Sequence, residues 1–201
     1  MKTTYYIISI VLSLLLSSCG QREKRYYLTD ADKAMIPYKT GDTIYCRDES
    51  GHQKILTVRD ISMDWDIWDD YIWDQYQTMS VRTEQNDFGL TLRIFGWNSG
   101  DLSQRSIQII HSSNLQLNVI YNATGDFTTS ANPNITPRWF VLDSLSIANR
   151  IYYNVAVYQH YDYFDDKTSE VYYNKTHGVL QMNLNEKPVF TLDTVIFAGD
   201  R

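Results

Sequence analysis

The sequence has 201 residues and carries 24 acidic against 18 basic side chains, so its formal net charge at pH 7 is −6. A chain this acidic lacks the positive surface that nucleic acids require, which excludes nucleic-acid binding as a function. Its length is sufficient for one domain with a full hydrophobic core.

The N-terminal stretch has the order of a secretory signal. A basic Lys2 precedes an apolar run from Tyr6 to Leu16, which is too short to span a bilayer and ends in small residues. Cys19 follows directly after Leu16-Ser17-Ser18, and this arrangement resembles the lipobox of bacterial lipoproteins. We therefore expect a signal peptide over 1–18, a lipidated tether over 19–25 and one β-rich domain over 26–201. The alternative is an ordinary cleaved signal with a chance cysteine.

The lipobox resemblance implies a location in the cell envelope. In that family the cysteine thiol takes a diacylglyceryl group, the signal is removed and the new amine is usually acylated. Two or three chains on Cys19 would hold the protein at a membrane by themselves. Gly20 stands where many lipoproteins retained at the inner membrane have Asp, which implies the outer membrane. Some lipoproteins that are exported to the cell surface carry an acidic run after the cysteine, whereas the run 21–25 is mixed and mostly basic. This favours the periplasmic face, and a location at the cell surface stays an alternative.

Taken in chain order, the elements begin with one short helix and continue as strands. Thr29 is a suitable N-cap for a helix over 30–36, which Pro37 ends. The remaining segments are rich in Tyr, Val, Ile and Thr, are separated by turn residues, and form successive hairpins. The expected strands are Thr43–Arg47, Gln53–Ile61, Tyr76–Gln85, Leu90–Trp97, Ser106–His111, Gln116–Tyr121, Arg138–Ile147, Ile151–His160, Val171–Asn174, Gly178–Leu184 and Val189–Ile196.

The absence of any alternation of strands and helices argues against a parallel sheet. About ten short-looped strands predict a mainly all-β fold, built as a single curved antiparallel sheet that is half-barrel or barrel-like. The helical content expected beside it is the short N-terminal helix and, in one interpretation of an aromatic segment, a second short helix near 64–74.

The C-terminal third carries a second resemblance. Ile151–Val155 followed by Val171–Leu180 is similar to a pattern of uncharacterised bacterial envelope lipoproteins, in which a Y-x-N-V strand precedes a Y-Y-x-x-x-x-G-hydrophobic hairpin. The resemblance implies a strongly curved antiparallel sheet, in some members like the half-barrel of periplasmic lipoprotein carriers. It assigns no catalytic residue. Gly178 is predicted to occupy a bend that other residues could not make.

The segment 64–76 concentrates three of the five tryptophans and five aspartates. Trp65, Trp68 and Ile72 have the spacing of an amphipathic helix, which would plug the end of the sheet and leave the aspartates in water. The functional interpretation is a ligand platform, in which flat rings contact sugar faces and carboxylates bind hydroxyls. A calcium site is less well supported because the glycine and closing Glu of an EF-hand loop are missing. The candidate ligand-binding residues are Trp65, Trp68, Tyr71 and Trp73.

Sequence motifs for catalysis, metal or cofactor binding do not occur. The chain has no G-x-S-x-G, no S-x-x-K and no glycine-rich phosphate loop, and its four histidines lack metal-binding spacing. Cys46 lies within a predicted strand and is expected to be a buried thiol rather than a nucleophile. We therefore expect no enzyme activity, no cofactor and no metal, although carboxylates paired in space for glycoside hydrolysis leave no sequence signal.

Two functional hypotheses remain. In the first, the protein is a non-enzymatic envelope lipoprotein that binds a glycan or a lipid-like ligand on its curved sheet or aromatic rim. In the second, it is a structural or accessory subunit that docks an envelope protein partner through the aromatic segment. An exposed aromatic patch would favour a partner, whereas a concave apolar cavity would favour a carried ligand.

Overall fold

The computed structural model describes residues 25–69, 72–84, 88–95, 104–111, 115–130, 137–162 and 166–200. Of these residues 71% lie in strands and 4% in helices, which confirms the predicted mainly-β class. The elements are β1 (Arg25–Tyr26), α2 (Asp30–Lys33), β2 (Thr43–Asp48), β3 (Gln53–Asp69), β4 (Ile72–Glu84), β5 (Leu90–Phe95), β6 (Gln104–His111), β7 (Leu115–Asn122), β8 (Arg138–Ile147), β9 (Arg150–Asp162), β10 (Lys167–Asn174), β11 (Gly178–Leu184), β12 (Lys187–Ile196) and the 3₁₀ turn η1 (Ala198–Asp200).

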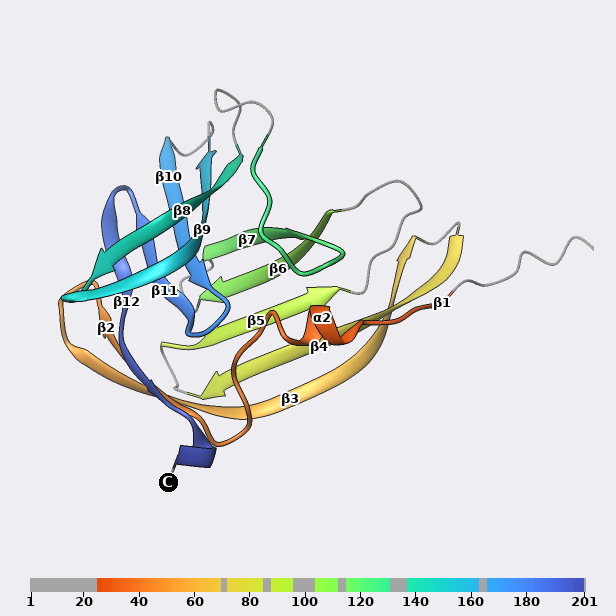
Figure 1. The fold of residues 1–201 in the computed structure, drawn as a ribbon, viewed down its shortest axis with the longest axis horizontal. Coiled ribbons are helices and arrows are strands. Elements are labelled where there is room, and N and C mark those ends of the chain that lie inside the picture. The colour runs from red at the N-terminus through yellow and green to blue at the C-terminus, as the bar shows by residue number, and fades with distance from the viewer. Residues whose placement is uncertain are drawn as a thin grey trace, which may run out of the picture.

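All the strands belong to one sheet (Figure 1). Its order is β7-β6-β5-β4-β3-β2-β12-β11-β10-β9-β8, and all neighbours along this path are antiparallel. Two meanders, β2 to β7 and β8 to β12, are therefore joined where the last strand returns to pair with β2. Strand β1 lies off this path and pairs in parallel with β4.

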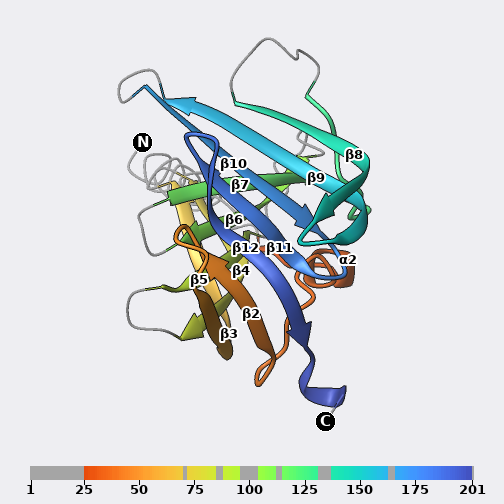
Figure 2. The same ribbon diagram turned by 90° about the vertical axis from the view of Figure 1, so that its left-hand side faces the viewer.

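The sheet curves until it is nearly closed and barrel-like, as predicted. Register shifts interrupt the ladders at several points, among them the step from Val58 to Asp60 and the step from Tyr172 to Tyr173. Such bulges bend a strand and increase its twist. Figure 2 shows the result, with β10 to β12 crossing in front of β5 to β7. The edge strand β7 contacts β9 and β10 across the interior, although its ladder partner is β6.

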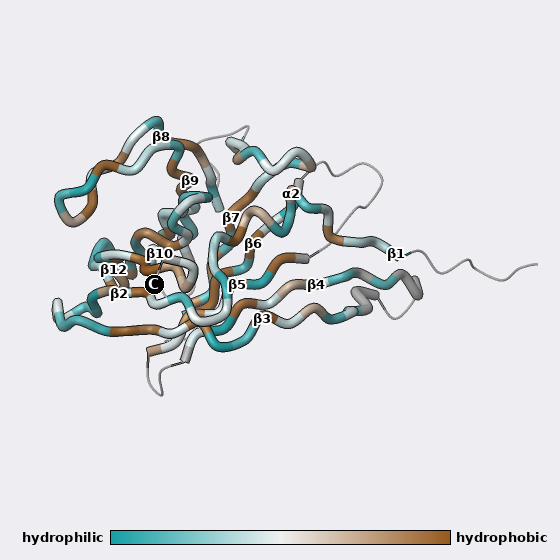
Figure 3. The backbone as a smooth tube through the Cα atoms, turned by 60° about the horizontal axis from the view of Figure 1, so that its bottom comes forward, coloured by the Kyte–Doolittle hydropathy of each residue, from teal (hydrophilic) through white to brown (hydrophobic). Residues whose placement is uncertain are grey.

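The core occupies the concave side of this sheet. Strict alternation places one residue in two inside, as along β7, where the odd-numbered residues from Leu115 to Tyr121 are buried and the intervening ones are less so. Figure 3 shows hydrophobic and hydrophilic bands following one another along the strands. Cys46 is one of the fully buried residues, and burial raises the pKa of its thiol to about 12. It is a buried, unpaired thiol, as predicted.

The segment 27–42 closes the interior by connecting the two meanders, and we call it the strap. Its side chains Leu28, Met35, Ile36 and Tyr38 are buried within the core. The short helix α2 lies in this segment and has the predicted cap, since Thr29 accepts a hydrogen bond from the backbone N–H of Asp32. In the described part of the chain, no helix has the length and apolarity to cross a membrane.

Asp32 fixes the strap to β6 and β7. Its carboxylate is fully buried, pairs with Arg105 and accepts a hydrogen bond of 3.1 Å from the hydroxyl of Tyr121. It also accepts hydrogen bonds of 2.7 Å from both the backbone N–H and the hydroxyl of Thr29. On the opposite meander, the Tyr173 hydroxyl donates to the carbonyl of Met35. The strap is therefore held by polar contacts at both sides of the interior.

The prediction of a short helix near 64–74 is wrong. Strand β3 continues to Asp69 and β4 begins at Ile72, and these two residues are paired in register. The run from Ser62 to Ile67 alternates strictly between polar and apolar residues, which is the period of a strand. Pairing along the whole of β4 satisfies the backbone of both strands, so this alternation prevails over the helical spacing of the tryptophans.

Gly178 has the predicted role at a bend. Its φ is +77°, and a Cβ at this position would overlap the hydroxyl end of Tyr38. That hydroxyl donates to the carbonyl of His177 at 2.8 Å and accepts from the N–H of Val179 at 3.0 Å. The strap thus reaches the turn between β10 and β11, and only glycine leaves room for the contact.

Candidate functional site

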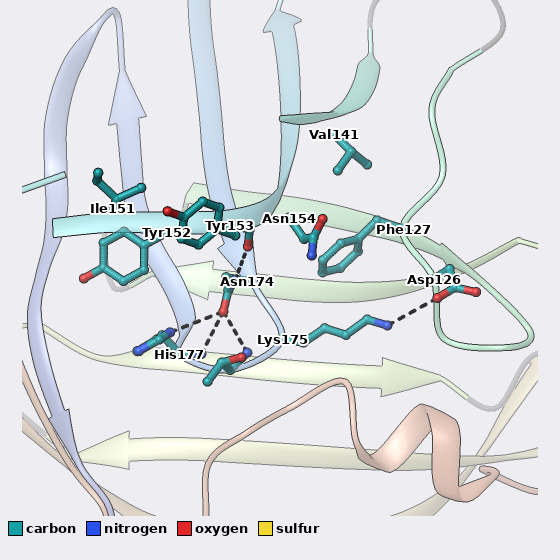
Figure 4. Close-up of a pocket in the computed structure, with 11 residues that line it drawn as sticks. Asp126, Phe127, Val141, Ile151, Tyr152, Tyr153, Asn154, Asn174, Lys175 and His177 are labelled. Atoms are coloured by element: carbon teal, nitrogen blue, oxygen red, sulfur yellow. Dashed lines mark hydrogen bonds and ion pairs between the residues drawn. The ribbon is translucent and has the colours of Figure 1, made fainter. Parts of the chain in front are cut away.

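A cleft of about 550 Å³ opens where the start of β9 meets the turn between β10 and β11 (Figure 4). The loop after β7 and one residue of β8 complete its wall. We call it the β9 cleft. Its lining combines aromatic rings with amide, imidazole, ammonium and carboxylate groups: Asp126, Phe127, Val141, Ile151, Tyr152, Tyr153, Asn154, Asn174, Lys175, Thr176 and His177.

The backbone of β9 turns its side chains into the cleft at Asn154. This residue has a φ of +53°, a left-handed conformation that Asn tolerates better than most side chains. Tyr152 before it is buried, whereas Tyr153 is 64% exposed and Ile151 is 63% exposed. Two large apolar side chains therefore stand in water beside the cleft, where a ligand could cover them.

Asn174 organises the opposite wall. Its Nδ2 donates to the carbonyl of Tyr153 on β9 at 2.5 Å, which fixes Oδ1 as the acceptor. Oδ1 then accepts the backbone N–H groups of Thr176 at 2.8 Å and of His177 at 3.2 Å. The side chain is 8% exposed, so these bonds are shielded from water. One amide thus holds the turn and the start of β9 in a fixed relation, as Figure 4 shows.

His177 and Tyr152 form the inner part of the cleft. Their rings meet edge to face with centroids 5.2 Å apart. Desolvation and the nearby charge of Arg150 lower the pKa of His177, so its imidazole is neutral at pH 7. The Tyr152 hydroxyl is buried and has no hydrogen-bond partner among the described residues. A buried hydroxyl without a partner is costly to the fold, and this one lies beneath the wall of the cleft rather than on its open surface.

An exposed ion pair lies at the outer end of the cleft. The Lys175 ammonium is 3.7 Å from Asp126 and 5.6 Å from the centroid of the Phe127 ring. A hydrogen bond from Thr124 and the charge of Lys175 lower the pKa of Asp126. Surface ion pairs of this kind contribute little to stability. Either charged group could therefore leave the other and bind a polar group of a ligand instead.

The residues predicted from the aromatic segment do not lie at this cleft. Trp65 is on β3, in the other meander, and is 42% exposed. Trp68 and Trp73 lie on β3 and β4, but their side chains are outside the described part of the structure, as are Tyr71 and Cys19. Within the described residues, no group of three His, Cys, Asp or Glu side chains could hold a metal ion.

The cleft residues were visible in the sequence as a pattern, but not as a site. Eight of the lining residues belong to the two segments, Ile151–Val155 and Val171–Leu180, which suggested only a hairpin. The signal that pointed to more was the doubled Tyr-Tyr-Asn, which begins at Tyr152 and again at Tyr172. Comparison with protein-family models, curated proteins and solved structures gave no match to this chain.

Proposed function

We propose that this chain is a lipid-anchored protein of the cell envelope that binds a glycan in the β9 cleft without transforming it. The observation that carries the proposal is the combination of the exposed aromatic ring of Tyr153 with fixed hydrogen-bonding groups in a concave site. Sugars present apolar C–H faces and many hydroxyls, so they need both kinds of contact. Tyr153 offers a face for stacking, and Asn154, Lys175 and Asp126 offer donors and acceptors.

The packing of the interior favours a glycan over a lipid-like ligand. A carrier of acyl chains needs a long apolar cavity on the concave side of its sheet. In this protein the strap occupies that side, with Leu28, Met35 and Tyr38 buried against the strands. The β9 cleft is open, and an acyl chain lying in it would contact the charged groups of Lys175 and Asp126.

The same lining argues for binding rather than hydrolysis. Glycoside hydrolysis generally requires two carboxyl groups that flank the bond to be cleaved. Asp126 is the one carboxylate among the described lining residues, and it is paired with Lys175. The described lining residues therefore supply contacts for a sugar but not the pair of carboxyl groups that a glycosidase uses.

The envelope location rests on the N-terminal sequence. Lipidation of Cys19 would tether the protein to a membrane, and Gly20 and the mostly basic run 21–25 favour the periplasmic face of the outer membrane. A second candidate function is an accessory subunit of an envelope complex. It is favoured by the exposed side chains of Tyr27, Met63 and Trp65, which a protein partner could cover.

The test is a glycan array probed with the protein purified from membranes in mild detergent, followed by calorimetric titration of the best ligand. We expect Tyr153→Ala to weaken binding about tenfold, which corresponds to about 1.4 kcal/mol for the lost ring contact. Ile55→Ala is the matched control, because Ile55 is an apolar residue that is 51% exposed and lies on β3, outside the lining of the cleft. Equal binding by both variants, or an array without ligands, would refute the assignment of the cleft.

A further inference from the structure

An exposed apolar patch lies on the extended hairpin of β3 and β4. It consists of Tyr27, Met63 and Trp65, which are 60%, 47% and 42% exposed, and we call it the hairpin patch. The rings of Tyr27 and Trp65 meet edge to face at 5.1 Å, and the Arg25 guanidinium lies 5.9 Å from the Trp65 centroid. These contacts hold the ring in place while leaving much of it in water.

The hairpin patch continues the apolar stripe of the core beyond the point where the core ends. Along β3 the stripe runs through Ile61 and Met63 to Trp65, opposite Val81, Met79 and Gln77 on β4. Val81 and Met79 are buried, whereas Met63 and Trp65 are not. The concave face of the hairpin therefore extends beyond the interior of the protein. There it forms an apolar surface that no described residue covers fully.

The charges of the hairpin are separated by face. Asp64 and Asp66 alternate with the patch residues, so they project from the opposite side of β3, where Asp66 pairs with Arg93. The Arg25 guanidinium contributes a cation to the patch. Tryptophan and tyrosine with a neighbouring arginine are the side chains that favour the boundary between lipid headgroups and acyl chains.

The tether places a membrane within reach of this patch. Arg25 is paired with Gln75 on β4, and it lies six positions after Cys19, with five residues between them. A fully extended chain spans at most about 3.5 Å per residue, so Arg25 lies within about 20 Å of a lipid on Cys19. Arg25 also contacts Trp65, as Tyr27 does.

We propose that the hairpin patch is a second membrane contact, in which Trp65, Tyr27 and Met63 enter the interface of the bilayer that holds the Cys19 lipid. This inference rests on the lipidation given under the proposed function. Together the lipid and the patch would fix the orientation of the protein. The β9 cleft is lined by residues from β8 to β11 of the other meander and from the loop after β7. Figure 1 shows β8 to β11 at the opposite side of the molecule from the end of β3 that lies beside β1. The cleft would therefore stay accessible to a glycan.

The experiment is hydrogen–deuterium exchange on the chain 19–201, coupled through Cys19 to a maleimide lipid in phosphatidylethanolamine–phosphatidylcholine vesicles. All contacts described above are made by residues from 25 to 200, so this chain retains them. Cys46 does not compete for the maleimide because its thiol is buried and its pKa is raised to about 12. Coupling should slow exchange about threefold or more in peptides from 60–69 and 72–80, relative to the uncoupled protein. Peptides from 150–156 should be unchanged.

A double variant, Met63→Ser with Trp65→Ser, should lose most of this protection, whereas Ile55→Ser should keep it. Equal exchange in the coupled and free proteins would overturn the proposal. Protection that appears without vesicles and increases with protein concentration would also overturn it, because a second copy would then cover the patch. The coupling imposes the tether chemically, so this result is independent of natural lipidation. Whether Cys19 is lipidated naturally is tested separately, by the mass of the mature protein isolated from membranes.

Discussion

The buried carboxylate of Asp32 allows a quantitative test of how the strap is held. Replacing it with Ala removes the acceptor for four donors: the N–H and hydroxyl of Thr29, the Tyr121 hydroxyl and the Arg105 guanidinium. The side chain of Arg105 is 10% exposed, so its charge would remain buried without its partner. Breaking a buried ion pair in this way costs about 3–5 kcal/mol, a large part of the 5–15 kcal/mol that typically stabilises a domain.

The assay is urea denaturation followed by far-ultraviolet circular dichroism. With an m-value of about 2 kcal/mol/M, a loss of about 4 kcal/mol lowers the midpoint by about 2 M. Asp30→Ala is the matched control, since Asp30 is in the same helical turn but fully exposed, 3.8 Å from Lys33. Its midpoint should stay close to that of the wild-type protein.

A double variant separates the lost hydrogen bonds from the stranded charge. Arg105→Met in the Asp32→Ala background removes the unpaired cation while keeping an apolar side chain of similar length. We expect it to recover about 2 kcal/mol, because apolar replacement of a whole buried pair is often well tolerated. The reasoning is refuted if Asp32→Ala is no less stable than Asp30→Ala, or if the double variant is as unstable as the single one.

Three further predictions follow from the buried groups of the fold. Burial lowers the pKa of His111 below its usual 6.5, so the unfolded state takes up a proton at a higher pH than the folded state does. The free energy of unfolding should therefore fall as the pH decreases below about 6.5. In urea unfolding measured at several pH values, His111→Phe should make this decrease smaller. Cys46 should react with a thiol reagent only in denaturant, and a native protein that reacts at once would contradict its burial. Gly178→Ala should cost about 2 kcal/mol or more, measured by the same unfolding assay, because it adds strain at positive φ and a clash with Tyr38; an unchanged midpoint would show that the turn adapts.

The sheet could be predicted from local sequence because each hairpin carries its own signals. The predicted segments Thr43–Arg47 and Gln53–Ile61 form β2 and the first part of β3, paired from Thr43 to Arg47. Alternation and turn residues act within a few positions, and such information is present in any window of the sequence. The same rule, applied to Ser62–Ile67, predicts a strand. The helical interpretation of 64–74 failed because it used only the spacing of the tryptophans.

The β9 cleft could not be predicted in this way because its walls meet only through long-range pairing. Asp126 and Lys175 are far apart in the sequence, and they approach each other because the sheet curls until β7 contacts β9 and β10. Curvature depends on bulges such as that at Tyr172–Tyr173, for which the sequence carries no clear mark. The pairing of Asn174 with the carbonyl of Tyr153 likewise follows from the register between strands.

The strap links the two ends of the molecule that the proposals concern. It begins at Tyr27, whose ring contacts Trp65 on the hairpin, crosses the interior at Asp32, and ends against the cleft, where the Tyr38 hydroxyl bonds both sides of Gly178. A lipid on Cys19 would therefore be attached to the element that also supports the wall of the cleft. Buried hydrogen bonds along this path keep it in one conformation. Together with the membrane contact proposed for the hairpin patch, this attachment would set the orientation of the cleft relative to the membrane.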